Sequence, residues 1–133
     1  MAAPADFFML ALCLWREARS EGETGIRAVG CVIRNRSLRT GNSVYKVVTA
    51  YRQFSSITAP EDHQLASYPA QTDSQWQLCQ KVASDILSAG SQPDLTGGAT
   101  MYYSDIIPPP RSWNFAKLTQ TVKIGHHIFF REE

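Results

Sequence analysis

The stretch ALCLWREARSEGETGIRAVGCVIRNR, residues 11 to 36, contains most of one apolar helical pattern and most of a second. The first pattern predicts an amphipathic helix over residues 5–19, which starts near Pro4 and Asp6. Its apolar positions follow the spacing i, i+3, i+4, i+7 and i+11: Phe7, Leu10, Ala11, Leu14 and Ala18.

The segment SEGE, residues 20–23, separates the two patterns and has the S-x-x-E form of a capping box. We therefore expect Ser20 and Glu23 to satisfy free amides at the start of a helix over residues 23–38. Gly41 is the expected stop signal. The inward side of this helix is expected to carry Ile26, Val29, Gly30 and Ile33, and its outward side Arg27 and Arg34.

Further helices are predicted downstream of this pair. A short helix is expected around residues 43–50, followed by an ordered irregular segment over residues 51–72 that contains two prolines. Residues 74–89 form the clearest amphipathic pattern, with a polar start and Gly90 just beyond its end.

The spacing of apolar residues in the last third of the chain changes from a helical to a strand-like pattern. ATMYYS, residues 99–104, and the runs 118–124 and 127–131 are predicted strands, with a turn near Gly125. Helices followed by a small antiparallel sheet predict an α+β domain that is mainly helical.

Size and composition favour one soluble domain over residues 1–133. The chain has 44% hydrophobic residues, shows no internal repeat, and carries a formal net charge of only +1. This balance excludes a general polyanion-binding protein and a disordered acidic tail. Residues 1–60 nevertheless hold eight Lys/Arg and four Asp/Glu. Such a bias favours an anionic partner, such as nucleic acid or a carboxylate-rich wall polymer, or simply a solvated Arg-rich helix face.

The three cysteines suggest where the chain folds. Cys13, Cys31 and Cys79 lie in apolar periodic segments without metal-ligand spacing, so we expect buried free thiols in a reducing cytoplasm. The run FFMLALCLW, residues 7–15, lacks the flanks of a signal peptide and is too short to span a bilayer. We therefore expect no signal peptide and no stable membrane association.

Glu17 is the first glutamate of the chain and lies at the end of the first apolar helix face. A carboxyl group at such a margin loses hydration, which raises its pKa and lets it act as a general acid. Glycoside cleavage uses a carboxyl group of this kind. The alternative is a surface ion pair with Arg16 or Arg19, the neighbouring cations.

As a block, residues 11–36 resemble the signature of the SleB-type cell-wall hydrolases, the family of spore cortex-lytic enzymes and related phage lysins. QFS at 53–55, DLTGGATMYYS at 94–104 and IGHHIFF at 124–130 resemble later blocks of that family, in order. The resemblance covers roughly residues 9–131. The residues of the first block that match are Glu17, Ala18, Arg19, Glu21, Ala28, Val29, Asn35 and Arg36.

This resemblance implies a lysozyme-like domain that cleaves peptidoglycan glycan strands between N-acetylmuramic acid and N-acetylglucosamine, without a cofactor. It places the catalytic glutamate on Glu17. The activity usual in the family is that of a lytic transglycosylase, in which one residue serves as acid and base and leaves a 1,6-anhydro end. A hydrolytic muramidase would instead need a second carboxylate. The candidates for it are Glu21, Glu23, Asp94 and Asp105.

Several residues are predicted to bind the substrate. Glu21 matches the family pattern, although capping a helix start explains it equally well. Gln53 and Ser55 are candidates for hydrogen bonds to sugar groups, Phe54 for the cleft wall, and Trp113 for stacking on a sugar or anchoring a loop.

Two pairs of adjacent aromatic residues near the end of the chain lie in or next to predicted strands, where neighbouring side chains point to opposite faces. Tyr102 and Tyr103 point to opposite faces if extended, so we expect one to pack inward and the other to face a sugar. His126 and His127 also alternate and lack the spacing of zinc ligands, so no metal site is predicted. The resemblance places His127 beside the cleft, where it braces the hairpin.

Two other functional classes stay open at this stage. A saccharide-binding domain without activity would keep the aromatic residues but would not need Glu17. A helical nucleic-acid-binding domain would use the arginines on or near the second helix. They are Arg27, Arg34, Arg36 and Arg39.

A bare domain of this kind, without a visible signal, linker or wall-anchoring module in the sequence, favours a phage or prophage endolysin over a spore enzyme. Such a protein is made in the cytoplasm of the bacterial host and reaches the wall, in the periplasm, with the help of a holin-type membrane-permeabilising partner. We expect it to act as a monomer.

Overall fold

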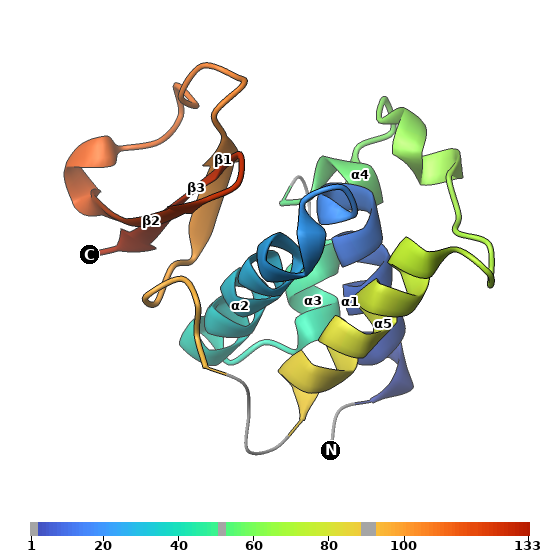
Figure 1. Ribbon diagram of the computed structural model, residues 1–133. Helices are drawn as coiled ribbons and strands as arrows, with labels where there is room; N and C mark the ends of the chain where they lie inside the picture. The colour runs from blue at the N-terminus through green and yellow to red at the C-terminus, as the bar shows by residue number, and fades with distance from the viewer. Residues whose placement is uncertain (1–2, 51–52, 89–92) are drawn as a thin grey trace.

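The computed structural model describes residues 3–50, 53–88 and 93–133. Helices form the first two thirds of the chain and a small antiparallel sheet forms the last third (Figure 1), which confirms the predicted α+β class. In chain order the elements are α1 (Pro4–Ala18), α2 (Gly22–Thr40), α3 (Val44–Thr49), α4 (Ser55–Thr58), η1 (His63–Ala66), α5 (Ser74–Leu87), β1 (Met101–Ser104), η2 (Phe115–Lys117), β2 (Leu118–Ile124) and β3 (His127–Glu132).

Helix α1 lies at the centre of the helical core, where it contacts α2, α3 and α5. Leu10, Ala11 and Leu14 are completely buried, as their helical spacing predicts. Helix α2 packs against α5 at Gly30, where an added Cβ would lie 3.0 Å from the Ile86 side chain. A larger residue at this position would require the Ile86 side chain to shift.

The predicted capping box at the start of α2 is wrong. The residue that precedes the helix is Glu21, and it makes no side-chain cap hydrogen bond. Gly22 adopts a φ of 78°, which allows the sharp turn out of α1 and directs Glu21 toward the sheet. Glu23 instead forms an ion pair with Arg27, one helical turn further along.

The sheet has the strand order β1-β3-β2, and all its strands are antiparallel. The predicted turn between the last two strands is confirmed, with Gly125 at a φ of 58°. Phe129 of β3 is completely buried in a small cluster with Ala28 and Val32 of α2. The sheet is therefore fixed to the helices through α2, and β1 forms one edge of the sheet.

The segment predicted to be irregular contains two helical turns, α4 and η1. Asp62 accepts a hydrogen bond from the backbone of Gln64 and so caps η1. The stop signal expected at Gly90 lies outside the described residues. Cys13, Cys31 and Cys79 are free and buried, as predicted. Among the described residues, no helix has the length and hydropathy needed to cross a membrane.

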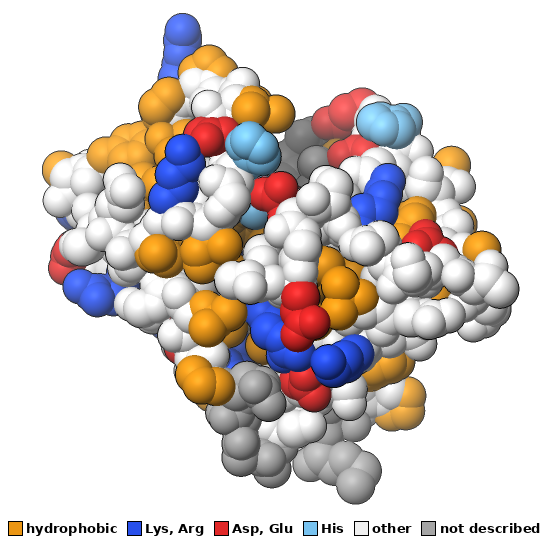
Figure 2. Space-filling view, viewed as in Figure 1, with side chains coloured by type: hydrophobic (Ala, Val, Ile, Leu, Met, Phe, Trp, Pro, Cys, Tyr) orange, Lys and Arg blue, Asp and Glu red, His pale blue; other side chains and the backbone are white. Residues whose placement is uncertain are grey.

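Acidic side chains lie close to Arg27 and Arg39 of α2. Arg27 pairs with Glu23 at 2.9 Å and with Asp85 at 2.8 Å, and on the face shown in Figure 2 basic and acidic side chains lie next to each other over α2. Arg39 pairs with Glu132 at 3.5 Å. These side chains do not form the unbroken basic face that a nucleic-acid interface requires.

Candidate active site

Glu17 lies in the last turn of α1, and its carboxyl group meets residues from two distant segments. Ser56 Oγ, in α4, donates to Oε2 at 2.5 Å, and Tyr102 Oη, in β1, donates to Oε1 at 3.2 Å. These partners are 39 and 85 residues away in the chain. Both carboxyl oxygens are thus held by neutral hydroxyl groups that only the folded chain brings together.

Burial raises the pKa of Glu17 above its ordinary value, because the charged form loses its hydration. The hydrogen bonds from Ser56 and Tyr102 act in the opposite direction, while the carboxylate of Asp62 raises the pKa further. Burial also raises the pKa of Tyr102, so its hydroxyl group stays a neutral donor. Glu17 therefore retains a proton at higher pH than an exposed glutamate does, as a general acid must.

The surface ion pair considered for Glu17 is absent from the described structure. Arg16 is only 6% exposed and donates hydrogen bonds to the backbone carbonyls of Ser56, Leu65 and Ser67. Arg19 lies over the Trp15 ring and donates to the backbone carbonyl of that residue. Both cations point away from the carboxyl group, because consecutive helical positions face different directions.

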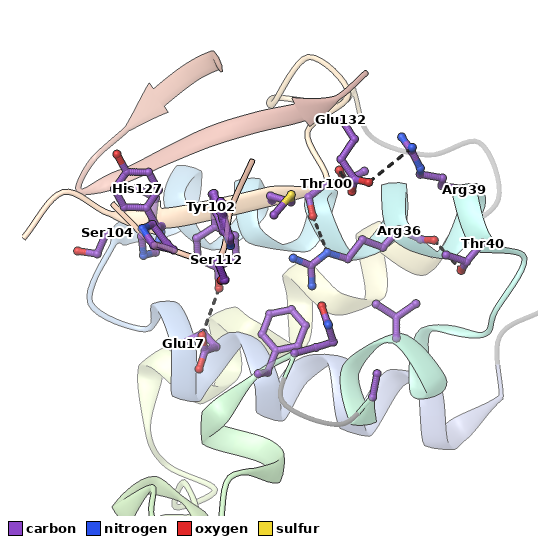
Figure 3. A pocket seen from close by; sticks show the side chains of 18 of the residues that line it. Glu17, Arg36, Arg39, Thr40, Thr100, Tyr102, Ser104, Ser112, His127 and Glu132 are labelled. Carbon is purple, nitrogen blue, oxygen red and sulfur yellow. Dashed lines mark hydrogen bonds and ion pairs between the residues drawn. The ribbon is translucent and has the colours of Figure 1, made fainter. Parts of the chain in front are cut away.

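A cleft of about 960 Å³ opens in front of Glu17, between the helices and strand β1 (Figure 3). This volume lies within the usual range for ligand sites. The cleft is lined by residues from α1, α2 and α3, from the segment just before α4, from β1 with the loop that follows it, and from β3. The predicted site residues that line it are Glu17, Gln53, Phe54, Tyr102, Tyr103, Trp113 and His127.

The two tyrosines of β1 lie on opposite faces of the strand, as its alternation predicts. Tyr102 pairs with Phe129 in the sheet and packs against His127, with ring centroids 4.8 Å apart. Tyr103 stacks on Phe130 at an interplanar angle of 11° and meets Trp113 edge to face. Tyr102 is thus the inward residue that holds Glu17, and Tyr103 and Trp113 form an aromatic wall of the cleft.

Glu21 contacts the turn between β2 and β3 and is not among the residues that line the cleft. Its Oε1 accepts a hydrogen bond from the His126 backbone at 3.3 Å and lies 3.7 Å from Nδ1 of His127. Burial lowers the pKa of His127, so the ring is neutral near pH 7. The side chain of Ser55 lies outside the described part of the structure.

His126 lies in the turn itself and is exposed, with Nδ1 3.1 Å from Oδ1 of Asp105. The two histidines thus point in different directions. Among the residues that the structure describes, no group of three His, Cys, Asp or Glu side chains could hold a metal ion.

The sequence did not indicate two residues of the cleft region. Ser56 was missed because SSIT, residues 55–58, was not recognised as a helical turn. In this turn it is Ser56 that donates a hydrogen bond to Glu17. Arg36 was considered only for nucleic-acid binding, yet it lines the cleft and lies over the Phe54 ring. Its match to the family signature was the one signal that pointed to a role here.

None of the four carboxylates considered as hydrolytic partners of Glu17 lines the cleft. Glu21 contacts the hairpin turn, Glu23 pairs with Arg27, and Asp105 pairs with Lys123 at 2.8 Å. Asp94 accepts hydrogen bonds within its own loop and from Asn35. Apart from Glu17, the described cleft lining contains one carboxylate, Glu132.

Replacing Tyr102 with phenylalanine is expected to move the alkaline limb of the kcat/KM profile to higher pH. In the native protein the hydrogen bond from Tyr102 favours the charged form of Glu17. Without this bond the pKa of Glu17 should rise further, so the carboxyl group stays protonated to higher pH. We expect kcat itself to fall about two- to tenfold. The measurement is product release against pH, with Tyr103→Phe as the matched control, whose alkaline limb should stay in place. A limb that moves to lower pH would contradict the assignment of Glu17 as the acid.

The structure is thus a mainly helical domain with an open cleft, and a buried carboxyl group of raised pKa lies in the cleft wall. The chain belongs to the cell wall hydrolase family, because the family profile described as Cell Wall Hydrolase matches residues 20–130. This match begins three residues after Glu17, so the role of Glu17 depends on the geometry above and on the resemblance of residues 11–36.

Two solved structures are similar to the whole chain. One is the catalytic domain of the germination-specific lytic transglycosylase SleB from Bacillus anthracis, with 27% sequence identity, a TM-score of 0.72, and coverage of 96% of this chain and 94% of that one. The other is the catalytic domain of the Bacillus cereus SleB protein, with 26% identity, a TM-score of 0.73, and coverage of 97% and 91%. No curated protein matches the chain significantly.

Proposed function

We propose that this protein cleaves the glycan strand of peptidoglycan between N-acetylmuramic acid and N-acetylglucosamine, as a lytic transglycosylase with Glu17 as its acid and base. The observation that carries the proposal is the buried carboxyl group of Glu17, held by Ser56 and Tyr102 in the wall of an open cleft. The similarity to the lytic transglycosylase SleB supports the same reaction.

The reaction needs two proton transfers at one carboxyl group. Protonated Glu17 gives its proton to the glycosidic oxygen, and the bond between this oxygen and C1 of the muramic acid breaks. The resulting carboxylate then accepts the proton of the 6-hydroxyl group of the same sugar, while O6 forms a bond to C1. The products are a free 4-hydroxyl group and a 1,6-anhydro end, Glu17 is protonated again, and no water is consumed.

The arrangement of carboxylates favours this outcome over hydrolysis. A hydrolytic glycosidase places a second carboxyl group roughly 5 to 9.5 Å from the acid. In the described cleft lining, the other carboxylate is Glu132, which accepts a hydrogen bond from Thr100 and pairs with Arg39. Figure 3 shows Glu132 beside Arg39 and Glu17 at the opposite end of the view.

Mass spectrometry of the products from purified peptidoglycan tests the proposal. We expect muropeptides with 1,6-anhydro ends, which are one water lighter than hydrolysis products. Reducing-ended products would show a muramidase and require a second carboxylate. The absence of any released glycan would favour a saccharide-binding domain.

We also propose, as a separate point, that the chain is a phage or prophage endolysin that folds in the host cytoplasm and reaches the wall with a holin-type partner. The three buried free cysteines support folding in a reducing compartment. Co-expression with and without a membrane-permeabilising protein tests this, because lysis should require both proteins. Efficient export of the chain without such a partner would contradict it.

A further inference from the structure

The cleft has a basic end, formed by Arg36 and Arg39 of α2 and by Lys46 of α3, just across the turn that joins these helices. Figure 3 shows Arg39 beside Glu132, far from Glu17, and the guanidinium of Arg36 nearer the middle of the cleft, below Thr100. The one carboxylate beside these cations is Glu132, so the three cations exceed the local negative charge.

The cations of the basic end are poorly neutralised within the protein. Lys46 is exposed and makes no ion pair with any described residue. Arg39 and Glu132 are 3.5 Å apart and both are substantially exposed, so water and salt screen their attraction. These side chains are therefore available to a negatively charged ligand in the cleft.

Arg36 provides an independent indication of a missing partner. Its Nε donates to the backbone carbonyl of Thr100 at 2.5 Å, whereas its Nη1 is buried with no hydrogen-bond partner among the described residues. Burial lowers the pKa of this guanidinium, and the nearby carboxylate of Glu132 acts in the opposite direction. Buried charges of this kind are normally paired, and guanidinium groups bind carboxylates especially well.

We propose that the basic end binds carboxylates of the peptide stems carried by the glycan strand, so that the protein prefers strands with charged stems. This inference rests on the proposed function, because it names the part of the peptidoglycan that the cleft recognises beyond the sugars. Each muramic acid carries its stem on the 3-lactyl group, and the stem contains free carboxylates. A strand bound with its scissile bond at Glu17 presents these groups to the flanking part of the cleft.

The test compares one peptidoglycan preparation before and after its stem carboxylates are converted to methylamides with carbodiimide and methylamine. The measured quantity is the preference, which is the ratio of the initial release rates from the untreated and the amidated wall. For the native protein at low salt we expect a preference of about two- to fivefold, and added salt should reduce it. Lys46→Gln should lower the ratio toward one, with the remaining preference due to Arg36 and Arg39.

Two matched variants control for effects unrelated to stem charge. Lys46→Arg keeps the charge and should keep the preference. Lys81→Gln removes an exposed lysine of α5 that does not line the cleft, and it should behave as the native protein. Because each variant is tested on both walls, a difference in wall accessibility multiplies every ratio by the same factor and cancels when the ratios of the variants are compared.

Equal rates of anhydro-product release from the two walls would overturn the stem-carboxylate site and leave the proposed function standing. A full preference retained by Lys46→Gln would overturn the role of Lys46 at the basic end. Release of no glycan from either wall would contradict the proposed function itself, and this inference with it.

Discussion

Replacing Glu17 with glutamine is expected to lower the rate of glycan release from peptidoglycan by about 10³-fold or more. Glutamine fits the same space between Ser56 and Tyr102, but it cannot give a proton to the glycosidic oxygen. Because the same group must then accept a proton from the 6-hydroxyl, both halves of the reaction are lost. The measurement is the initial rate of anhydro-muropeptide release at the pH optimum of the native protein.

The matched control for this variant is Glu23→Gln. Glu23 is exposed, pairs with Arg27 and does not line the cleft, so its loss should leave the rate within about twofold of the native value. A loss below tenfold in Glu17→Gln would contradict the assignment of Glu17 as the acid.

The same substitution should make the protein more stable at neutral pH. Burial raises the pKa of Glu17 in the folded state, so the folded chain holds the proton more tightly than the unfolded chain. Ionisation of Glu17 therefore destabilises the fold as the pH rises from the unfolded pKa to the folded pKa. Thermal unfolding should show that the gain in Tm of Glu17→Gln grows over this window and is constant above it.

The sequence predicted most of the fold because its signals are local. The helical spacing of Leu10 and Leu14, the stop at Gly41 and the turn at Gly125 each depend on a few neighbouring residues, and the structure confirms all three. The prediction of a capping box was wrong because the interaction that competes with it involves a residue far away in the sequence. Glu21 is drawn to the turn at His126, which no short window of the sequence can indicate.

The candidate site was predicted less completely, for a related reason. The position of Glu17 at the margin of an apolar face was visible in the helix pattern, and its burial followed from that position. Its two hydrogen-bond partners come from α4 and β1, and only tertiary packing brings these elements together. The basic end of the cleft also depends on packing, because its cations come from two helices, α2 and α3, that are separated by a turn.

Arg16 connects helix α1, which carries Glu17, to the segment that carries Ser56. Its guanidinium donates to the Ser56 carbonyl at 2.9 Å, to the Leu65 carbonyl at 3.3 Å, and to the Ser67 carbonyl at 3.0 and 3.2 Å. It also lies 4.9 Å from the centre of the Tyr68 ring. Since Arg16 precedes Glu17 in the chain, one turn of helix both presents the acid and fixes the segment that holds it.

Replacing Arg16 with methionine is therefore expected to reduce both stability and activity. Methionine keeps the apolar part of the side chain but leaves three backbone carbonyls without their donor, at a cost of about 3 kcal/mol in the free energy of unfolding. For a domain of this size the Tm should fall by about 10 °C. At temperatures where the variant is folded, kcat should fall about tenfold, because Ser56 is no longer held against Glu17.

Arg19→Met is the matched control, because Arg19 lies on the same helix end but reaches the segment only through the side chain of Gln64. Its loss should cost about 1 kcal/mol and leave kcat nearly unchanged. Arg16→Lys keeps the charge with fewer donors in a different geometry, so its stability should be intermediate between the native protein and Arg16→Met. Native stability and native kcat in Arg16→Met would show that packing of α4 and η1 alone positions Ser56, and that the carbonyl contacts of Arg16 contribute nothing to the site.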